Sequence, residues 1–165
     1  MRKTLSCLCV AVVAVAAGPT VLKDYPITSL EGVISRTGVT LNRTLTTDRN
    51  GSLQIVARGP RTVHLFETGP IDVENARLIY QAKLRTLNVK GDAYLEMLCH
   101  FPGRGEFFSR GLQYALSGTN DWVSVETVFF LRKGENPDNV KLNLVFTGKG
   151  MAWIDEIKLL KAPLE

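Results

Sequence analysis

Short segments in which apolar and polar residues alternate follow one another along most of the chain, and they end at Gly, Pro, Asn or Asp. The segment 39–46 alternates in this way, and the next one begins at Leu53. Between them, Asn50-Gly51 is a strong hairpin signal, because a type I′ turn needs positive φ at both central residues. A period of two places apolar side chains on one face of a strand. The pattern therefore predicts antiparallel β structure.

The same alternation continues through the rest of the chain. Further strands are predicted at 63–67, 78–84, 93–101, 122–131 and 140–146, and a strand pair or a bent strand is predicted at 107–116. In the segment 93–101, Cys99 has the same parity as its apolar neighbours, which predicts a buried residue. Eight or more short strands, each with one apolar face, are best buried when two antiparallel sheets pack face to face. We therefore expect an all-β, two-sheet antiparallel β-sandwich of jelly-roll type; the alternative is an up-and-down barrel with a ligand cavity.

The last predicted strand, 153–159, departs from strict alternation. Asp155 and Glu156 separate Ile154 from Ile157, so the two isoleucines are three positions apart. A regular strand would turn them to opposite faces. Both can face the core only if the strand contains a β-bulge between them. The segment thus predicts a bulged strand that closes the sandwich.

The first 17 residues have the three parts of a secretory signal. Arg2 and Lys3 form the basic start, an apolar run rich in Val and Ala follows, and small residues come at its end. The run is too short to span a bilayer. The alternative is a retained helical anchor or a buried first strand. We expect cleavage near Ala16 or Ala17, a secreted or periplasmic (cell-envelope) protein, and no membrane span after cleavage.

The expected boundaries are a signal peptide at 1–17, an N-terminal linker at 18–28, one jelly-roll domain at 29–161 and a C-terminal tail at 162–165. A mature chain of about 148 residues can bury a sufficient core without covalent cross-links. Cleavage leaves Cys99 as the single cysteine, so no disulfide can form within the chain. The sequence therefore predicts one domain held together by its apolar core.

Charge and chemical motifs exclude several functions. The net charge is +4, and removal of the two basic residues of the signal lowers it to +2. Charges of both signs are scattered over the predicted strands, which argues against nucleic-acid binding. The two histidines, His64 and His100, lie on different predicted strands without a zinc-site motif. Glu96 with Glu106 or Glu126 could form the carboxylate pair of a small hydrolase, but no accompanying motif is present. We expect no enzyme.

Three blocks carry a resemblance to a known class of domain. They are Asn75–Lys83, Ser117–Val123 and Gly150–Leu159, in this order along the chain. Together they resemble the galactose-binding-like jelly rolls that occur as carbohydrate-binding modules. The resemblance implies a secreted, non-catalytic module that binds a carbohydrate. Because such domains also serve as spacers and protein-binding modules, the alternative is a structural or protein-interaction domain of the cell envelope, with an envelope protein as its partner.

The resemblance also implies one structural calcium ion. Such modules hold it with a carboxylate of the closing strand, oxygen atoms of a hairpin and an acidic residue near the first strand. Calcium takes six to eight oxygen ligands. The matching positions are Asp155, Asn50 and Ser52. Asp24 and Glu31 flank the place of the N-terminal carboxylate. The alternative is that Asp155 satisfies its hydrogen bonds within the bulge.

The same resemblance implies a sugar site on a sheet face or in loops at the edge of the sandwich. Exposed aromatic rings would stack on the sugar, and polar side chains would bind its hydroxyls. The candidate residues are Gln81, Arg85, Tyr94, Glu96 and His100, with Lys141 and Asn143 farther along. We expect the first two to lie on one strand and the next three on its neighbour, with Tyr94 as the stacking platform. The alternative is an ordinary solvated sheet face.

Overall fold

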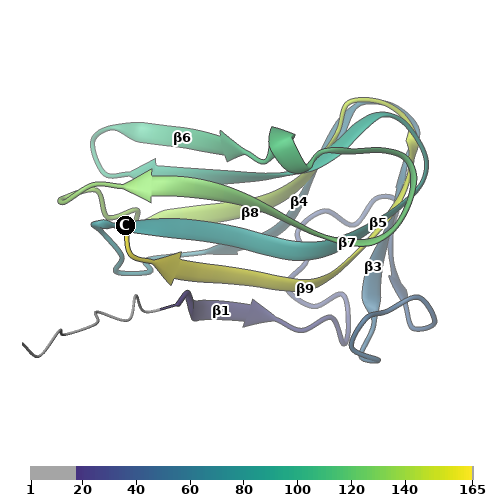
Figure 1. The fold of residues 1–165 in the computed structure, drawn as a ribbon, viewed down its shortest axis with the longest axis horizontal. Helices are drawn as coiled ribbons and strands as arrows, with labels where there is room; N and C mark the ends of the chain where they lie inside the picture. The colour runs from purple at the N-terminus through teal and green to yellow at the C-terminus, as the bar shows by residue number, and fades with distance from the viewer. Residues whose placement is uncertain (1–17, 165) are drawn as a thin grey trace, which may run out of the picture.

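The computed structural model describes residues 18–164, and the predicted signal peptide lies outside these residues (Figure 1). Nine strands form one antiparallel network. They are β1 (Thr20–Tyr25), β2 (Val39–Asn42), β3 (Ser52–Ala57), β4 (Arg61–Thr68), β5 (Ala76–Phe101), β6 (Gly105–Arg110), β7 (Leu116–Leu131), β8 (Asn139–Phe146) and β9 (Gly150–Ala162). A single 3-10 turn, η1 (Leu112–Tyr114), follows β6. The described part of the chain is therefore almost entirely β structure.

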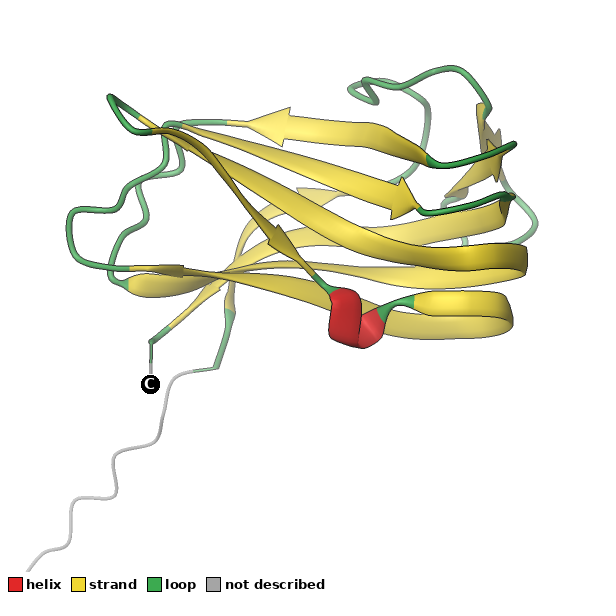
Figure 2. Cartoon of the chain, turned by 90° about the horizontal axis from the view of Figure 1, so that it is seen from above, coloured by secondary structure: helices red, strands yellow, loops and turns green. Residues whose placement is uncertain are grey.

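Strand β5 organises the fold because it runs through both layers. Its first half pairs with β7 on one edge and β9 on the other, and its second half pairs with β6 and β8. Between the halves, Asn88 and Gly91 have positive φ values of 53° and 84°. The strand bends there and folds the network onto itself. Figure 2 shows the strands lying in two layers, with η1 at the margin.

We call the two layers sheet I and sheet II. Sheet I contains the first half of β5 with β7 and β9, and β9 is flanked by β1 and by β3, which pairs with β2. Sheet II has the order β6, second half of β5, β8 and β4. The predicted two-sheet jelly-roll sandwich is thus confirmed, and the barrel alternative is not formed.

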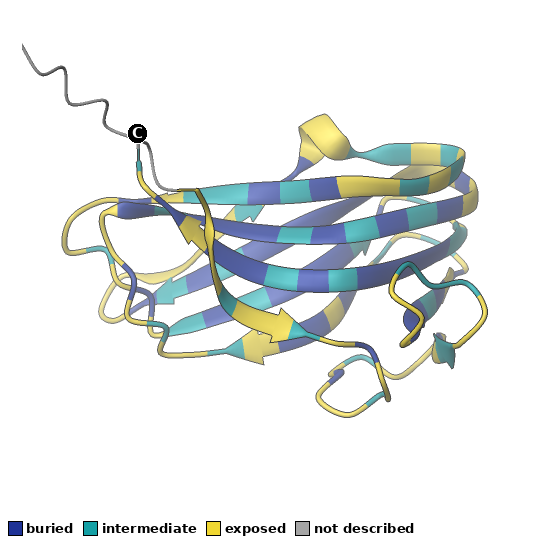
Figure 3. Cartoon of the chain, turned by 60° about the horizontal axis from the view of Figure 1, so that its bottom comes forward, coloured by how far each residue is buried: buried dark blue, intermediate teal, exposed yellow. Residues whose placement is uncertain are grey.

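The core lies between the two inner faces. Leu78 and Leu84 of sheet I are fully buried, as are Leu95 and Leu142 of sheet II, and all belong to one apolar cluster. Along the long strands buried residues alternate with more exposed ones (Figure 3), as a period of two requires. Cys99 is buried in this cluster, and burial raises the pKa of its thiol to about 12. Cys99 is therefore a neutral thiol in the core. The sequence predicted its burial.

The closing strand β9 contains the predicted bulge. Glu156 has a φ of 48°, the register with β5 shifts opposite this point, and Ile154 and Ile157 are both fully buried. The outer edge of β9 also changes partner here. Residues 150–154 pair with β3, whereas residues 157–161 pair with β1. The bulge therefore marks the point where the chain passes from one edge partner to the other.

Two sequence predictions about organisation need correction. The segment 18–28 was predicted to be a linker, but it contains β1, which pairs with β9 along residues 157–161. The segments 78–84 and 93–101 were predicted as neighbouring strands, but they are the two halves of β5. No helix within residues 18–164 is long and apolar enough to cross a membrane.

Candidate functional site

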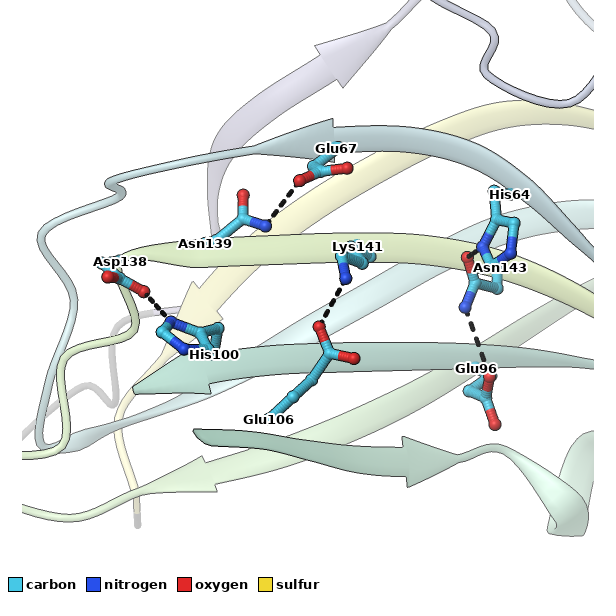
Figure 4. Close-up of polar contacts among 9 residues, drawn as sticks. All are labelled: His64, Glu67, Glu96, His100, Glu106, Asp138, Asn139, Lys141 and Asn143. Carbon is cyan, nitrogen blue, oxygen red and sulfur yellow. Dashed lines mark hydrogen bonds and ion pairs between the residues drawn. The ribbon is translucent and has the colours of Figure 1, made fainter. Parts of the chain in front are cut away.

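The outer face of sheet II carries a row of polar side chains that crosses all four strands. His64 on β4 lies opposite Asn143 on β8, Asn143 lies opposite Glu96 on β5, and Glu96 lies opposite Arg110 on β6. Each of these residues has the parity that points away from the core. Three of them are labelled in Figure 4, where they lie side by side across the strands. We call the outer surface of β6, β5, β8 and β4 around this row the sheet-II face.

A continuous hydrogen-bonded chain links the row. The distance from His64 Nδ1 to Asn143 Oδ1 is 3.0 Å, and Asn143 Nδ2 donates to Glu96 Oε1 at 3.2 Å. Arg110 Nε donates to Glu96 Oε2 at 2.7 Å. Asn143 is fully buried, so its amide needs both partners. Because its oxygen accepts from His64, the proton of a neutral His64 lies on Nδ1, and Nε2 is left as an acceptor.

A second row beside the first provides an aromatic ring. Phe108 on β6 lies opposite Leu98 on β5, and Leu98 lies opposite Lys141 on β8. Phe108 is 59% exposed, and the guanidinium of Arg110 lies 4.2 Å from the centre of its ring. Sugar rings bind proteins by placing an apolar face on such a ring. Phe108 therefore joins an apolar platform to the polar row.

Polar contacts continue toward the other end of the face. Lys141 Nζ lies 2.6 Å from Glu106 Oε2, and this hydrogen bond raises the pKa of Lys141. His100 Nδ1 lies 2.6 Å from Asp138 Oδ1. Figure 4 shows both contacts beside the first row, with the side chains drawn from neighbouring strands. The sheet-II face therefore presents hydrogen-bond donors and hydrogen-bond acceptors. Some of these groups are charged and others are neutral.

A hollow lies at the β4 side of this face. It has a volume of about 230 Å³ and is lined by Ile34, His64, Glu67 and Lys141. The loop that supplies Ile34 is fixed along the edge of β4, because Ile34 N donates to Leu65 O at 3.1 Å. The polar row is thus bordered by a concave wall. An extended ligand that crosses the strands would pass from Phe108 to this hollow.

The structure divides the predicted sugar-binding cluster between two surfaces. Glu96 and His100 lie on the sheet-II face, as predicted, together with Lys141 and Asn143. Gln81 and Arg85 lie on the outer face of sheet I, where Gln81 contacts Glu126 and Arg85 pairs with Asp121. The reason is the bend in β5, which directs the outer faces of its two halves to opposite sides of the sandwich. A single site with all five residues cannot form.

Tyr94 also differs from its predicted role. It points to the outer side of sheet II, but it is only 7% exposed. A buried ring cannot stack on a sugar. Phe108 is the accessible ring on this face, and the pair Phe107-Phe108 could have revealed it, because adjacent residues of a strand point to opposite faces. Phe107 takes the inner position, with its ring 5.9 Å from that of Phe101.

The carboxylates considered for hydrolysis are held by different partners. Glu96 is bound by Arg110 and Glu106 by Lys141, both on the sheet-II face. Glu126 lies on the outer face of sheet I, on the other side of the sandwich, where Gln81 contacts it. Glu96 and Glu126 therefore do not share a cleft.

Asp155 is fully buried at the bulge of β9 and is held by the loop 46–47. Its Oδ2 accepts hydrogen bonds from Thr46 Oγ1 at 3.0 Å, Thr47 N at 2.7 Å and Thr47 Oγ1 at 2.8 Å. Its Oδ1 accepts one from Glu156 N at 2.8 Å. A buried carboxylate needs such donors. Asp155 thus ties the loop to the closing strand.

The residues present do not fit a calcium ion as they are arranged. Ser52 Oγ donates to Leu45 O at 2.6 Å, and Asn50 Nδ2 donates to Asp48 at 2.8 Å. The backbone oxygens of Thr28 and Asn50 accept hydrogen bonds from the guanidinium of Arg43, at 3.0 and 3.4 Å. The guanidinium of Arg43 thus already binds the backbone oxygen of Asn50, in the turn before β3, and that of Thr28, in the segment after β1. Within residues 18–164 no three His, Cys, Asp or Glu side chains converge as for a metal ion.

The calcium ion stays a prediction of the resemblance, with a direct test. If the contacts of Asp155 and Arg43 are the stable arrangement, the unfolding temperature will be the same in calcium and in chelator. An ion that binds only the native state must raise that temperature. Differential scanning calorimetry in the two buffers decides the question. A clear rise with calcium would mean that Asp155, Asn50 and Ser52 rearrange around the ion.

Comparison with known proteins gives a match at the level of the fold. No family model matches the chain, and no curated protein matches it. Among solved structures, the CBM22-1 xylan-binding domain of Paenibacillus barcinonensis Xyn10C is similar, with a TM-score of 0.61 and 15% identity over 92% of this chain and 100% of that one. The tandem CBM22-1–CBM22-2 domain of the same protein gives 0.65 and 15% identity, over 92% of this chain and 47% of that one.

A third structure, the CBM22-1–GH10 modules of Clostridium thermocellum Xyn10B complexed with xylohexaose, gives a TM-score of 0.61 at 7% identity. It covers 84% of this chain and 28% of that one. Identities this low establish the fold and nothing finer. The chain has the β-sandwich fold of carbohydrate-binding modules, which confirms the resemblance found in the sequence.

Proposed function

We propose that this protein is a secreted or envelope-located, non-catalytic module that binds a polysaccharide along the sheet-II face. The observation that carries the proposal is the accessible ring of Phe108 next to a hydrogen-bonded polar row that crosses four strands. A sugar would stack on Phe108, and its hydroxyls would bind Arg110, Lys141 and the free Nε2 of His64. Glu96 holds Arg110 in place, Asn143 holds His64, and Glu106 holds Lys141.

The fold supports this proposal, because similar folds are described as xylan-binding domains. Xylan is therefore the first ligand to test. The preformed network also favours binding. Arg110 is fixed by Glu96 and His64 by Asn143, so less side-chain freedom is lost when a sugar binds than at an unstructured surface.

Replacement of Phe108 by Ala will weaken binding of the polysaccharide about tenfold, because the stacking platform is lost. The measurement is isothermal titration with xylan and with a panel of neutral β-linked polysaccharides. Phe130→Ala is a matched control, since Phe130 is 61% exposed on the outer face of sheet I. Equal losses in the two variants, or no binding of the wild type across the panel, would refute the proposal.

The alternative of a protein-interaction domain has one observation in its favour. The outer face of sheet I carries an apolar row near the termini, in which Val21, Leu160, Ile79 and Val128 lie opposite one another on β1, β9, β5 and β7. Val21 is 50% exposed. A partner protein captured by the wild type and lost after Val21→Asp would support this alternative.

A further inference from the structure

A second surface, on sheet I at the bent end of the sandwich, has a different chemistry. Val56 on β3, Met151 on β9 and Leu87 on β5 lie opposite one another and form an apolar floor. A groove of about 510 Å³ lies over this floor. A second hollow of about 520 Å³ adjoins it and shares Val56 and Arg58. Together they form one extended depression, which we call the basic groove.

Four cations surround the basic groove, namely Arg58, Arg61, Lys90 and Lys149. Neither hollow is lined by Asp or Glu. None of the ion pairs found among residues 18–164 involves these four side chains. Elsewhere among residues 18–164, four of the other 14 Arg and Lys residues have a carboxylate partner, namely Arg85, Arg104, Arg110 and Lys141. The basic groove is therefore a positively charged surface that the chain itself does not neutralise.

The backbone brings two of these cations together. Lys90 N donates to Lys149 O at 2.7 Å, which joins the bend of β5 to the turn between β8 and β9. Gly148 permits this approach, because a Cβ atom there would lie 1.8 Å from Lys90 O. Lys90 and Lys149 both line this groove, and like charges that lie close together repel. A ligand that carries negative groups would relieve this repulsion.

The arrangement of the charges suits a polymer. Arg58 follows β3, Lys149 precedes β9 and Lys90 lies in β5, and these three strands are neighbours in sheet I. Adjacent strands are about 4.8 Å apart, so the cations follow one another across the sheet at short intervals. A chain with one negative group on each unit can contact several of them.

The floor selects among polyanions. It consists of aliphatic and thioether groups, and no aromatic side chain lines either hollow. Trp153, on the same face of β9 as Met151, is only 6% exposed. Single-stranded nucleic acids need exposed rings on which their bases stack. A sugar ring can instead place its C–H groups on aliphatic side chains while its carboxylate meets a Lys or an Arg.

We propose that the basic groove binds an acidic polysaccharide, a chain of uronic acid residues whose carboxylates pair with Arg58, Lys149 and Lys90. This goes beyond the proposed function, because it adds a second site of a different ligand class on the opposite sheet. The two proposals can fail separately. Phe108→Ala will leave binding at the basic groove unchanged.

The test uses the full chain and polygalacturonate, with fully methyl-esterified polygalacturonate as the neutral counterpart. The wild type will bind the acid and not the ester, and higher ionic strength will weaken the binding. Lys90→Gln with Lys149→Gln will lower the affinity about tenfold, because two charge contacts are lost. Lys23→Gln with Lys133→Gln removes the same charge from exposed positions outside the groove, and it will change the affinity less than twofold.

Three outcomes would overturn the proposal. An equal loss in the two double variants would show attraction by net charge alone. Equal binding of the ester would show that the carboxylates are not recognised. Single-stranded DNA or polyglutamate that competes as strongly as polygalacturonate would show a site for polyanions in general. Circular dichroism of each variant verifies that the sandwich is intact before its affinity is compared.

Discussion

Asp155→Ala will lower the free energy of unfolding by about 3–5 kcal/mol, because it removes a buried acceptor that binds four donors. Thr47 N and the Thr47 hydroxyl would lose their acceptor, and the Thr46 hydroxyl would keep only its contacts with Asp48 and Gly51. The cavity would lie at the bulge of β9, where its partner changes from β3 to β1. Denaturant unfolding followed by tryptophan fluorescence measures the change.

Asp24→Ala is the control for this prediction. Asp24 is exposed on β1, and its removal will change stability by less than about 0.5 kcal/mol. Both variants are measured in chelator, so that a bound ion does not contribute. A loss below about 1 kcal/mol for Asp155→Ala would show that the loop 46–47 is held by other contacts.

Gly148→Ala will destabilise the protein by about 3 kcal/mol, since a methyl group at this position collides with the backbone of Lys90. The collision involves a carbonyl oxygen and carbon at 1.8 and 2.9 Å, which cannot move aside as a flexible side chain could. The bend of β5 must separate from the β8–β9 turn to accept it. Thermal unfolding measures the loss, and the hydrogen bond between Lys90 N and Lys149 O is the contact that breaks.

Gly59→Ala is the matched control, because no atom lies within 4 Å of a Cβ at Gly59. This substitution will leave stability unchanged or raise it by up to about 1 kcal/mol. If Gly148→Ala were as stable as Gly59→Ala, the two segments would not be packed backbone against backbone. The Gly148 variant also separates Lys90 from Lys149, so any folded fraction should bind polygalacturonate more weakly.

The architecture was predictable because it depends on local periodicity. Alternation identified most strands, and the spacing of Ile154 and Ile157 located the bulge of β9. The continuity of β5 was not predictable in this way. Polar residues between Leu87 and Ala93 look like a turn, yet the chain there stays paired with β7 while it bends. Only the partner strands on both edges show that 78–84 and 93–101 are one strand.

The candidate site was predictable only in part, for the same reason. Glu96, His100 and Asn143 were placed correctly by parity within their strands. Gln81 and Arg85 obey the same parity, but the bend sends their face to the opposite side. The burial of Tyr94 also depends on tertiary packing, which alternation does not describe. Phe108 could have been found, because one of two adjacent phenylalanines in a strand must face outward.

The pairing of β1 with β9 determines how the domain responds to tension. Thr20 lies opposite Lys161, so both ends of the described chain leave the sandwich at the same end, away from the bend of β5 (Figure 1). A force that pulls these ends apart acts first on the outermost hydrogen bonds and then on each following one. The two strands would separate like a zipper, at low force. A domain tethered through both ends would therefore release its first strand early, while the interior of each sheet still carries no load.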